Sequence, residues 1–454
     1  MDINSIKKMY FVGVGGIGMS ALARFFKQRG VVVNGYDRTE TELTKTLVKE
    51  GIGITYSDSE TALNKDVDVV IYTPAIPKDC IILNWFRDND CQVYKRSDAL
   101  QWITKAMFAI TVAGTHGKTT TSTMIAHLLR ASGYGCNAFL GGISVNYHTN
   151  YWHAENDNQV AVIEADEYDH SFLKLFPDIG IVTAMDPDHL DIYGTAEAVT
   201  QAYVDYSKNI KSGGLLIRKH GLKQGSLLQG DRKMSYSLQS SGADIYADNI
   251  QMRNGTYKFD VMGNGIYIPE VQLNIGGMHN VENCIAAIAV AHKLEIEPEL
   301  IKEAVASFKG VKRRFEYVVK NENIVFIDDY AHHPEELMAL LRSAKTLFSK
   351  KRIVIAFQPH LYTRTRDFAE GFAKALDIAD EVILLDIYPA RELPIEGVSS
   401  QMIKEMMGNP NVTVLTKEGL LEYAAQAPLE VFITAGAGDI DKLVAPLKEI
   451  IEKR

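Results

Sequence analysis

The sequence is short of cysteine, of basic residues relative to acidic ones, and of long apolar runs. Its four cysteines, at positions 80, 91, 136 and 284, form no CxxC pair, which is typical of a reducing compartment and argues against structural zinc. The formal net charge of -9 argues against non-specific binding to nucleic acid. No segment reaches the roughly 18 apolar residues of a membrane span. Glycines break the first apolar run, so we expect no signal peptide, no membrane partner and a cytoplasmic location.

What is present is the composition of a globular enzyme, with 46% apolar and 23% charged residues. A strand, a glycine turn and a helix are predicted within residues 109–130. The apolar run Ala109–Ala113 predicts a buried strand, and the apolar residues after the turn have helical spacing. The turn between them, GTHGKTT, is typical of a phosphate-binding loop at the positive end of a helix.

In such a loop, Lys118 reaches the β- and γ-phosphates and the Thr119 hydroxyl binds Mg²⁺. An ordinary strand-to-helix turn with a surface lysine is the alternative. The candidate nucleotide-binding residues are Gly114, Thr115, His116, Gly117, Lys118, Thr119 and Thr120.

A second glycine-rich turn, GVGGIG, follows the predicted strand Met9–Val14. The helix Met19–Arg29 and the strand Val31–Tyr36 are predicted next, and the latter ends at Asp37. This arrangement predicts a Rossmann-like turn, whose glycines let the backbone approach a diphosphate. A turn without a ligand is the alternative, and any nucleoside diphosphate has the required group. The loop after the predicted strand Val67–Tyr72 and one later arginine could also contact such a ligand. The candidate substrate-binding residues are Gly13, Gly15, Gly16, Ile17, Gly18, Asp37, Thr73, Pro74, Ala75 and Arg96.

Acidic residues follow two predicted strands of the central region. Glu164 comes directly after the strand at 159–163, and His189 lies in the turn after the strand Ile179–Ala184. Both are candidate Mg²⁺ ligands beside the phosphate loop, and two metal sites suit phosphoryl transfer. A solvated acidic loop is the alternative reading of the first motif. Residues 233–275 alternate like antiparallel strands, and Asn283 either caps the helix that follows or binds a base or ribose.

Polar residues also gather at three strand ends of the last region, after Ile324–Ile327, Ile353–Phe357 and Glu430–Thr434. Alternating strands and helices predict a parallel sheet, with ligands at the carboxyl ends of its strands. We therefore expect an α/β protein with three domains, at residues 1–105, 106–312 and 313–454. The first and last are Rossmann-like, and the central one is a phosphate-loop domain with a parallel sheet plus antiparallel strands.

In order and spacing, the motifs resemble those of the Mur ligases of peptidoglycan synthesis over essentially the whole chain. They are GVGGIGMS, GTHGKTT, EADEYD, DPDHLD, GMHNVEN, RRFE, DDYAHHPEE, FQPHLYTRT and GAGD. The resemblance implies an N-terminal UDP-sugar domain, a central ATPase domain, and a C-terminal domain that closes over ATP and brings the amino acid. The DYAHHP and FQPH stretches favour the member that joins L-alanine to the lactyl carboxylate of UDP-N-acetylmuramate through an acyl phosphate, with ATP and Mg²⁺.

The resemblance also implies roles for single residues. Lys118 holds the ATP phosphates, and the metal ligands are Thr119, Glu164 and His189. Asn283 lies at the adenine position, Arg314 and Asp329 contact the nucleotide, and Tyr330 lies near the base. His332, His333 and Arg364 belong to the amino-acid side. Leu361 stands where many relatives have arginine. The candidate catalytic residues are Lys118, His189, Arg314, Asp329, His332, His333 and Arg364.

Three alternatives remain open. A murein-peptide ligase would join a tripeptide to the same UDP-sugar. An NAD-dependent oxidoreductase fused to an ATPase would need a hydride-transfer site, which the sequence does not reveal. A phosphate-loop binding module would hydrolyse ATP slowly and without any UDP-sugar. The general base is His189 or one of His332 and His333, because imidazole titrates near neutral pH. We expect a monomer or a homodimer.

Overall fold

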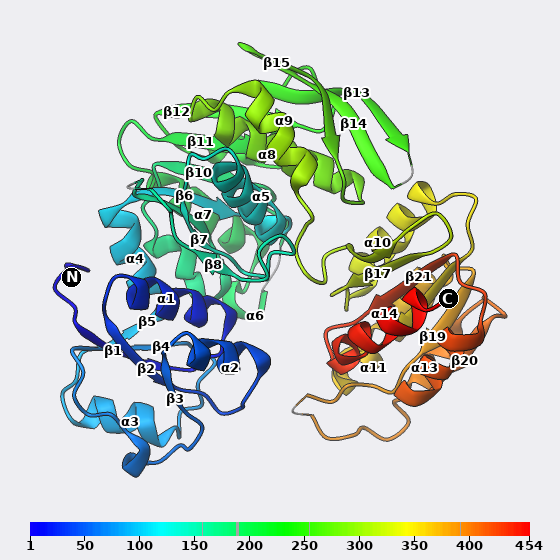
Figure 1. Ribbon diagram of the computed structural model, residues 1–454, viewed down its shortest axis with the longest axis horizontal. Coiled ribbons are helices and arrows are strands. Elements are labelled where there is room, and N and C mark those ends of the chain that lie inside the picture. Colours follow the sequence, from blue (N-terminus) through cyan, green and yellow to red (C-terminus); the bar gives the residue numbers. More distant parts are fainter. Residues whose placement is uncertain (157, 188–189, 254, 391) are drawn as a thin grey trace. The chain divides into compact units, whose positions relative to one another are not determined.

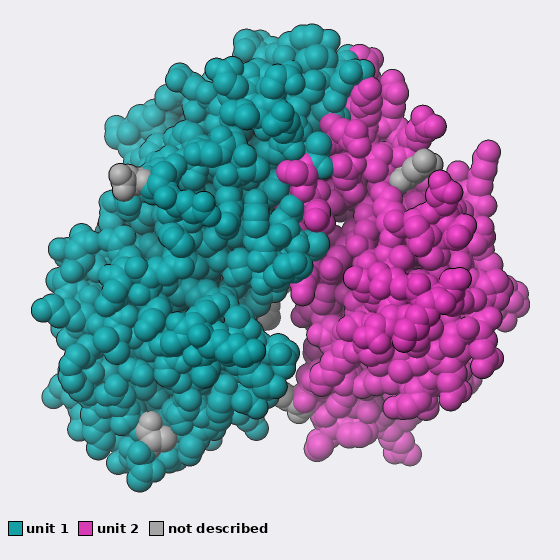
Figure 2. Space-filling model, in the orientation of Figure 1, with its two compact units in different colours: residues 1–248, 260–271, 282–306 teal, residues 249–259, 272–281, 307–454 magenta. Residues whose placement is uncertain are grey.

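The computed structural model describes residues 1–156, 158–187, 190–253, 255–390 and 392–454. Three β-sheets organise this part of the chain (Figure 1). The chain divides into two compact units (Figure 2). Unit 1 comprises residues 1–248, 260–271 and 282–306, and unit 2 comprises residues 249–259, 272–281 and 307–454.

The first sheet has five parallel strands in the order β3-β2-β1-β4-β5. Strand order reverses on either side of β1, and such a switch point is where open α/β sheets bind ligands. Its strands are β1 (Lys8–Val12), β2 (Val32–Tyr36), β3 (Gly53–Thr55), β4 (Val69–Tyr72) and β5 (Val93–Lys95). Its helices are α1 (Ile17–Gln28), α2 (Glu42–Lys49), η1 (Glu60–Ala62), α3 (Ile81–Asp88) and α4 (Arg96–Ala106).

The central sheet has ten strands in the order β15-β14-β13-β12-β11-β10-β6-β9-β7-β8. Strand β6 is parallel to both of its neighbours, β9 and β10. The strands are β6 (Phe108–Ala113), β7 (Asn137–Phe139), β8 (Tyr151–Trp152), β9 (Val160–Glu164), β10 (Ile179–Val182), β11 (Leu215–Lys219), β12 (Arg232–Ser237), β13 (Ile245–Arg253), β14 (Thr256–Gly263) and β15 (Ile266–Leu273). The helices are α5 (Lys118–Ala131), η2 (Tyr168–Lys174), α6 (Leu190–Tyr193), α7 (Ala196–Lys208), η3 (Gly225–Leu227), α8 (Met278–Lys293) and α9 (Pro298–Ser307).

The expectation of antiparallel strands from residue 233 holds for only part of that stretch. Strand β12 is parallel to β11 and to the start of β13. Alternation of apolar and polar residues marks a strand with one buried face, but it does not give the strand's direction. Strands β14 and β15 are neighbours joined by two residues, a connection that only antiparallel strands allow.

The third sheet has six strands in the order β16-β17-β21-β18-β19-β20. Five of them are parallel as expected, whereas β16 is antiparallel to β17 at the edge. The strands are β16 (Glu316–Lys320), β17 (Val325–Asp329), β18 (Ile353–Phe357), β19 (Glu381–Leu384), β20 (Val412–Val414) and β21 (Val431–Ala435). The helices are α10 (Pro334–Leu347), α11 (Tyr362–Leu376), α12 (Ser400–Met406), α13 (Lys417–Gln426), η4 (Asp439–Leu443) and α14 (Val444–Glu452).

Within unit 1, a continuous apolar core joins the first sheet's helices to the central sheet. The Phe25 ring of α1 lies 5.2 Å from the Phe139 ring of β7 and 6.4 Å from the Tyr151 ring of β8. This packing holds α1, which begins at the first glycine turn, against the central sheet. No helix within the described ranges is long and apolar enough to cross a membrane.

Candidate active site

The turn between β6 and α5 has the expected form of a phosphate-binding loop. Gly114 and Gly117 have φ values of +135° and +81°, which disfavour any residue with a side chain. Lys118 is the first residue of α5, and its Nζ donates to the Gly114 carbonyl at 2.8 Å. The lysine therefore folds back over the loop, where a phosphate would lie. Thr120 lies in the first turn of the same helix.

Lys118 also pairs with Glu167, a residue that the sequence does not single out. Its Nζ lies 2.8 Å from Glu167 Oε1, and the Glu167 side chain is only 2% exposed. Four acidic residues crowd the EADEYD stretch, and nothing in the pattern distinguishes the one whose carboxylate turns inward.

Glu164, the last residue of β9, faces the first turn of α5. Its Oε1 accepts a hydrogen bond from the Thr119 hydroxyl at 3.0 Å, and its Oε2 accepts one from the Gly141 N–H at 3.0 Å. Desolvation raises the pKa of this carboxyl, while the nearby Lys118 charge and the Thr119 hydroxyl lower it. A hydroxyl and a carboxylate side by side are oxygen ligands that suit Mg²⁺. His189, the other predicted ligand, lies outside the described residues.

The end of β10 supports the loop from its other side. The Thr183 hydroxyl donates to the His116 carbonyl at 2.5 Å and to the Ala113 carbonyl at 3.1 Å. The Asp186 N–H donates to the Thr115 hydroxyl at 3.2 Å. Thr183 is not among the residues predicted from the sequence, and its place at the end of a neighbouring strand is the signal that could have found it.

Asn283 of α8 also lies beside the loop within unit 1. It is 7% exposed, and a Cβ placed on Gly117 would lie 2.8 Å from its Oδ1. The structure therefore brings the predicted adenine residue to the phosphate loop.

The first glycine turn is closed by its own chain. The N–H groups of Gly13 and Val14 donate to the Tyr36 carbonyl at 2.7 and 3.0 Å. The Gly15 N–H donates to Asp37 Oδ2 at 2.8 Å. Gly16 precedes α1 and points the helix N-terminus at the turn. Asp37 therefore braces the turn, whereas a dinucleotide fold uses its acidic residue on the ribose.

Two further predicted residues lie against this turn. A Cβ on Gly13 would lie 3.0 Å from the Thr73 methyl group, which places the Thr73–Pro74–Ala75 loop beside it. A Cβ on Gly18 would overlap the guanidinium of Arg96, whose Nη2 lies 3.2 Å from Asp166 Oδ2. Arg96 thus reaches from the first glycine turn to the acidic stretch after β9.

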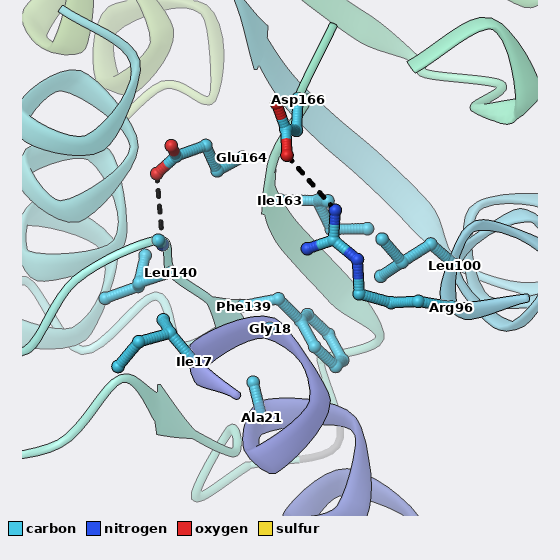
Figure 3. A pocket seen from close by; sticks show the side chains of 11 residues that line it. Ile17, Gly18, Ala21, Arg96, Leu100, Phe139, Leu140, Ile163, Glu164 and Asp166 are labelled. Carbon is cyan, nitrogen blue, oxygen red and sulfur yellow. Dashed lines mark hydrogen bonds and ion pairs between the residues drawn. The ribbon is translucent and has the colours of Figure 1, made fainter. Parts of the chain in front are cut away.

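A cavity of about 260 Å³ lies between these two groups of residues (Figure 3). One wall comes from α1 and α4, and the opposite wall comes from the ends of β7 and β9. The lining residues are Ile17, Gly18, Ala21, Arg96, Leu100, Phe139, Leu140, Gly141, Ile163, Glu164 and Asp166. The cavity therefore runs from the first glycine turn to the carboxylate beside the phosphate loop.

In unit 2, the RRFE and DDYAHHPEE motifs lie together. Asp329, the last residue of β17, accepts hydrogen bonds from the N–H groups of Phe315 and Ala331, both at 2.7 Å. The guanidinium carbons of Arg313 and Arg314 lie 5.0 and 5.6 Å from the centre of the Tyr330 ring. The predicted residues Arg314, Asp329 and Tyr330 are therefore neighbours.

Asp328, next to this group, is a buried carboxyl that the sequence pattern does not distinguish from its neighbour. It is 1% exposed, and its Oδ1 accepts from the Thr434 hydroxyl at 2.6 Å. Arg313 Nε lies 3.5 Å from its Oδ2. Burial outweighs these partners and raises the pKa of Asp328 to about 7.

The predicted amino-acid side of the site separates into two environments. His332 Nδ1 lies 3.0 Å from the Tyr330 carbonyl and 3.2 Å from Glu336 Oε2, and burial lowers the pKa of His332. The ring centres of His332 and His360 are 6.3 Å apart. His360 Nδ1 lies 3.4 Å from Arg364 Nη1. His333 instead packs its ring on Phe368, with 4.7 Å between the ring centres.

Leu361 precedes α11 with a φ of +71°, a conformation that a branched side chain rarely adopts. Its N–H donates to the Tyr388 carbonyl at 2.9 Å. The chain is thus held in a strained turn directly before the helix that carries Arg364.

Comparison with known families matches three consecutive models to the chain. The Mur ligase family catalytic domain matches residues 8–107, the Mur ligase middle domain matches residues 112–291, and the Mur ligase glutamate ligase domain matches residues 313–438. The chain therefore belongs to the Mur ligase family, and its three-domain α/β architecture is the one predicted.

Within the family, the chain is similar over its full length to UDP-N-acetylmuramate–L-alanine ligases. It is 47% identical to that of Parabacteroides distasonis and 45% identical to that of Cytophaga hutchinsonii, covering 100% of this chain and 99% of each relative. Among solved structures, the UDP-N-acetylmuramate-alanine ligase of Thermotoga maritima matches with a TM-score of 0.83 and 31% identity over 98% of both chains. A murein peptide ligase of Psychrobacter arcticus shares the fold, with a TM-score of 0.69 and 21% identity over 97% of this chain and 99% of that one.

Proposed function

We propose that this chain joins L-alanine to the lactyl carboxylate of UDP-N-acetylmuramate, with ATP as the energy source, in the synthesis of peptidoglycan precursors. The observation that carries the proposal is the cavity between the first glycine turn and Glu164, because it joins a diphosphate-binding element to a phosphate-transfer element. The similarity to alanine-adding ligases over the whole chain supports the same conclusion.

We assign the UDP-sugar to residues 1–105, ATP to residues 106–312 and the amino acid to residues 313–454. The N-terminus of α1 suits the diphosphate, because the N–H groups of its first turn, including those of Ile17 and Gly18, have no partner within the helix. Arg96 and the Thr73–Ala75 loop lie beside that turn and suit the rest of the sugar nucleotide. Lys118 and the loop 114–120 hold the ATP phosphates, with Asn283 near the base.

The reaction needs activation because a carboxylate oxygen is a poor leaving group. The lactyl carboxylate oxygen attacks the γ-phosphorus, the bond to the bridging oxygen breaks, and ADP leaves. The amine nitrogen of L-alanine then attacks the acyl carbon, and inorganic phosphate leaves from the tetrahedral intermediate. Lys118 stabilises the charge of the transferred phosphoryl group through its ammonium.

Of the two candidate histidines that the structure describes, His332 and His333, the former is better suited to take the ammonium proton. Its Nδ1 faces two acceptors, the Tyr330 carbonyl and Glu336, so that nitrogen carries the hydrogen and Nε2 keeps the lone pair. Burial and the nearby Arg364 charge lower its pKa, with Glu336 acting in the opposite direction. The ring is therefore neutral near pH 7 and can accept a proton. The guanidinium of Arg364 suits the carboxylate of the amino acid.

Thr119 and Glu164 are the residues that would hold Mg²⁺. When bound, the ion supplies positive charge that offsets the charge of the ATP phosphates. Both oxygens already lie within hydrogen-bonding distance of each other, which fits a shared cation. We further infer a monomer or a homodimer, which light scattering would distinguish, and a cytoplasmic setting, where ATP and UDP-sugars are found.

The test is phosphate release from ATP with UDP-N-acetylmuramate, measured with and without L-alanine. We expect turnover only with all three substrates, and loss of turnover when EDTA removes divalent ions. A preference for the tripeptide over L-alanine would favour the murein-peptide ligase. Phosphate release that is independent of the UDP-sugar would contradict the proposal.

A further inference from the structure

Asn150, the residue just before β8, links the first glycine turn to the central sheet from a fully buried position. It is 0% exposed. Its Nδ2 donates to the Ile17 carbonyl at 2.6 Å and to the Ser20 hydroxyl at 3.0 Å. Ile17 is the first residue of α1, so this amide holds the end of the helix that lies at the turn.

The other end of the Asn150 amide is held equally firmly. Its Oδ1 accepts from Arg24 Nη1 at 2.6 Å. Arg24 is itself 7% exposed, and its Nε and Nη2 donate to the two carboxylate oxygens of Glu50 at 2.7 and 3.0 Å. Such a forked pair restricts the guanidinium to one orientation. The amide therefore cannot turn without breaking a charged contact.

The backbone of Asn150 continues the link toward the phosphate loop. Its carbonyl accepts from the Leu140 N–H at 3.0 Å. The next residue along the chain, Gly141, donates its N–H to Glu164, which in turn accepts from Thr119. A continuous chain of hydrogen bonds and one peptide step thus joins α1 to the metal-binding carboxylate. Ile17 and Gly18 line one side of the cavity in Figure 3, and Glu164 lines the other. Gly141 is also a lining residue.

Two ion pairs between these regions are more exposed. In the Lys95–Asp169 pair the side chains are 39% and 35% exposed, and in the Arg96–Asp166 pair they are 23% and 38% exposed. Exposed ion pairs reorganise readily and contribute little to rigidity. The Asn150 amide is itself buried and has a backbone carbonyl as a partner, so it restrains the backbone itself.

From this geometry we infer that Asn150 is a positioning residue, which sets the separation between the lactyl carboxylate and the γ-phosphate of ATP. The inference rests on the proposed function, because that separation matters only if the two groups react. A misplacement of about 1 Å between reacting groups lowers a rate by roughly 100-fold. Each substrate still has its own binding elements, the first glycine turn and the phosphate loop, so its affinity should change little.

The test compares wild-type protein with Asn150→Ala and Asn150→Asp. In Asn150→Asp, the ionised carboxylate keeps the contact with Arg24 but cannot donate to the Ile17 carbonyl. We expect both variants to lower kcat by about 10- to 100-fold. The Kd values for UDP-N-acetylmuramate and for a non-hydrolysable ATP analogue, each measured alone by calorimetry, should stay within about threefold of wild type.

Asn156→Ala is the matched control. Asn156 also bonds backbone carbonyls through its amide, those of Tyr134 at 2.9 Å and Gly133 at 3.3 Å, but it is exposed and away from the cavity. Its kcat should equal that of wild type.

Several outcomes would overturn the inference. A wild-type kcat in Asn150→Asp would do so, as would a loss of UDP-sugar affinity with kcat unchanged. If Asn150→Ala fails to fold, Asn150→Asp decides alone, because it keeps the charged contact to Arg24. Wild-type protein serves as the reference for the proposed function. If it shows no UDP-sugar-dependent phosphate release, the proposed function fails and the positioning role fails with it. If wild-type protein turns over and the Asn150 variants match it, only the positioning role fails.

Discussion

Lys118 has two partners in unit 1, the Gly114 carbonyl and the Glu167 carboxylate, both at 2.8 Å. The Glu167 carboxylate is only 2% exposed, so it holds the ammonium group in one place, directed at the loop. The lysine is therefore held ready for a phosphate before the nucleotide arrives, which is the condition for electrostatic stabilisation of a transition state.

Replacing Lys118 tests its role directly. Lys118→Ala should lower UDP-sugar-dependent ADP release by at least about 100-fold, since it removes a preorganised positive charge from the transferred group. Lys105→Ala, in the same unit but packed on the Phe176 ring, is the matched control and should retain the wild-type rate. A coupled assay for ADP gives both rates, and normal turnover in Lys118→Ala would remove the phosphate loop from the mechanism.

Asp328 leads to a prediction about stability and pH. Its pKa is about 7 in the folded chain, against about 3.9 in an unfolded chain. Between these values the folded state binds more protons than the unfolded state, so stability falls as pH rises. The protonated Asp328 carboxyl contributes fully to the free energy of unfolding below about pH 4, and this contribution is lost as the pH rises through 7. Each unit of difference between the folded and unfolded pKa corresponds to about 1.4 kcal/mol.

Asp328→Asn should remove this dependence, because an amide does not ionise. Hydrogen-exchange mass spectrometry of peptides from β17 over a urea series would measure the urea concentration at the midpoint of unfolding, at pH 5 and at pH 8. When the pH is raised from 5 to 8, the urea midpoint of the wild-type protein should fall by more than the urea midpoint of Asp328→Asn. Equal changes in both proteins would show that Asp328 is ionised throughout.

The sequence alone identified many of these residues, but not all. Lys118, Thr119 and Glu164 stand within short motifs whose chemistry can be read locally, and the structure places them together. Thr183 and Asn150 lie 67 and 133 positions from residues they contact, His116 and Ile17. Their roles depend on which strands become neighbours, and a single sequence does not reveal that. His189 lies outside the described residues, so its metal role stays a prediction.

At the scale of elements, the start of α5 combines a strained residue with a close neighbour. Gly117 has a φ of +81°, and a Cβ there would lie 2.8 Å from Asn283 Oδ1. Gly133, after the other end of α5, has a similar φ of +78°, but a Cβ there would meet nothing within 4 Å. The two glycines therefore share the backbone strain and differ in the contact.

Gly117→Ala should weaken ATP binding, whereas Gly133→Ala should not. Both substitutions cost about 1 kcal/mol or more for a left-handed conformation, so both melting temperatures should fall, and that of Gly117→Ala should fall further because of the contact with Asn283. Only Gly117→Ala also displaces Asn283 and the loop N–H groups, and we expect its Kd for ATP to rise by at least about tenfold. Equilibrium dialysis with labelled ATP would measure this, and equal affinities in the two variants would contradict the predicted loop geometry.

The elements themselves were predicted well wherever apolar runs ended at glycine or at acidic residues. Strand β18 has the predicted bounds, and β6, β9 and β17 differ from prediction only at their ends. The direction of β12 was predicted wrongly, and β16 was not predicted. Each lies beside a parallel core strand, and direction there depends on how the connecting loop returns rather than on the residues of the strand.

At the scale of the whole molecule, all three tryptophans, Trp85, Trp102 and Trp152, belong to unit 1. Tryptophan fluorescence therefore reports the unfolding of unit 1 alone. The predicted UDP-sugar residues belong to that unit as well, so a ligand at the first glycine turn should stabilise what the fluorescence detects.

We expect UDP-N-acetylmuramate to raise the fluorescence-detected Tm, because a ligand that binds only the folded state at 100 times its Kd stabilises it by about 2.7 kcal/mol. NADH at the same concentration should leave the Tm unchanged, since the Asp37 carboxylate already accepts hydrogen bonds from the Gly15 and Thr39 N–H groups. A shift with NADH and none with the UDP-sugar would favour the oxidoreductase reading of the glycine turn.

The missing side chain of Gly18 has a consequence for how this protein can diverge. The guanidinium of Arg96 occupies the space where a methyl group at position 18 would lie. A lineage that gains any side chain at position 18 must therefore shorten or redirect residue 96 in the same step or before it. We expect descendants of this sequence to keep the glycine and the arginine together or to lose both.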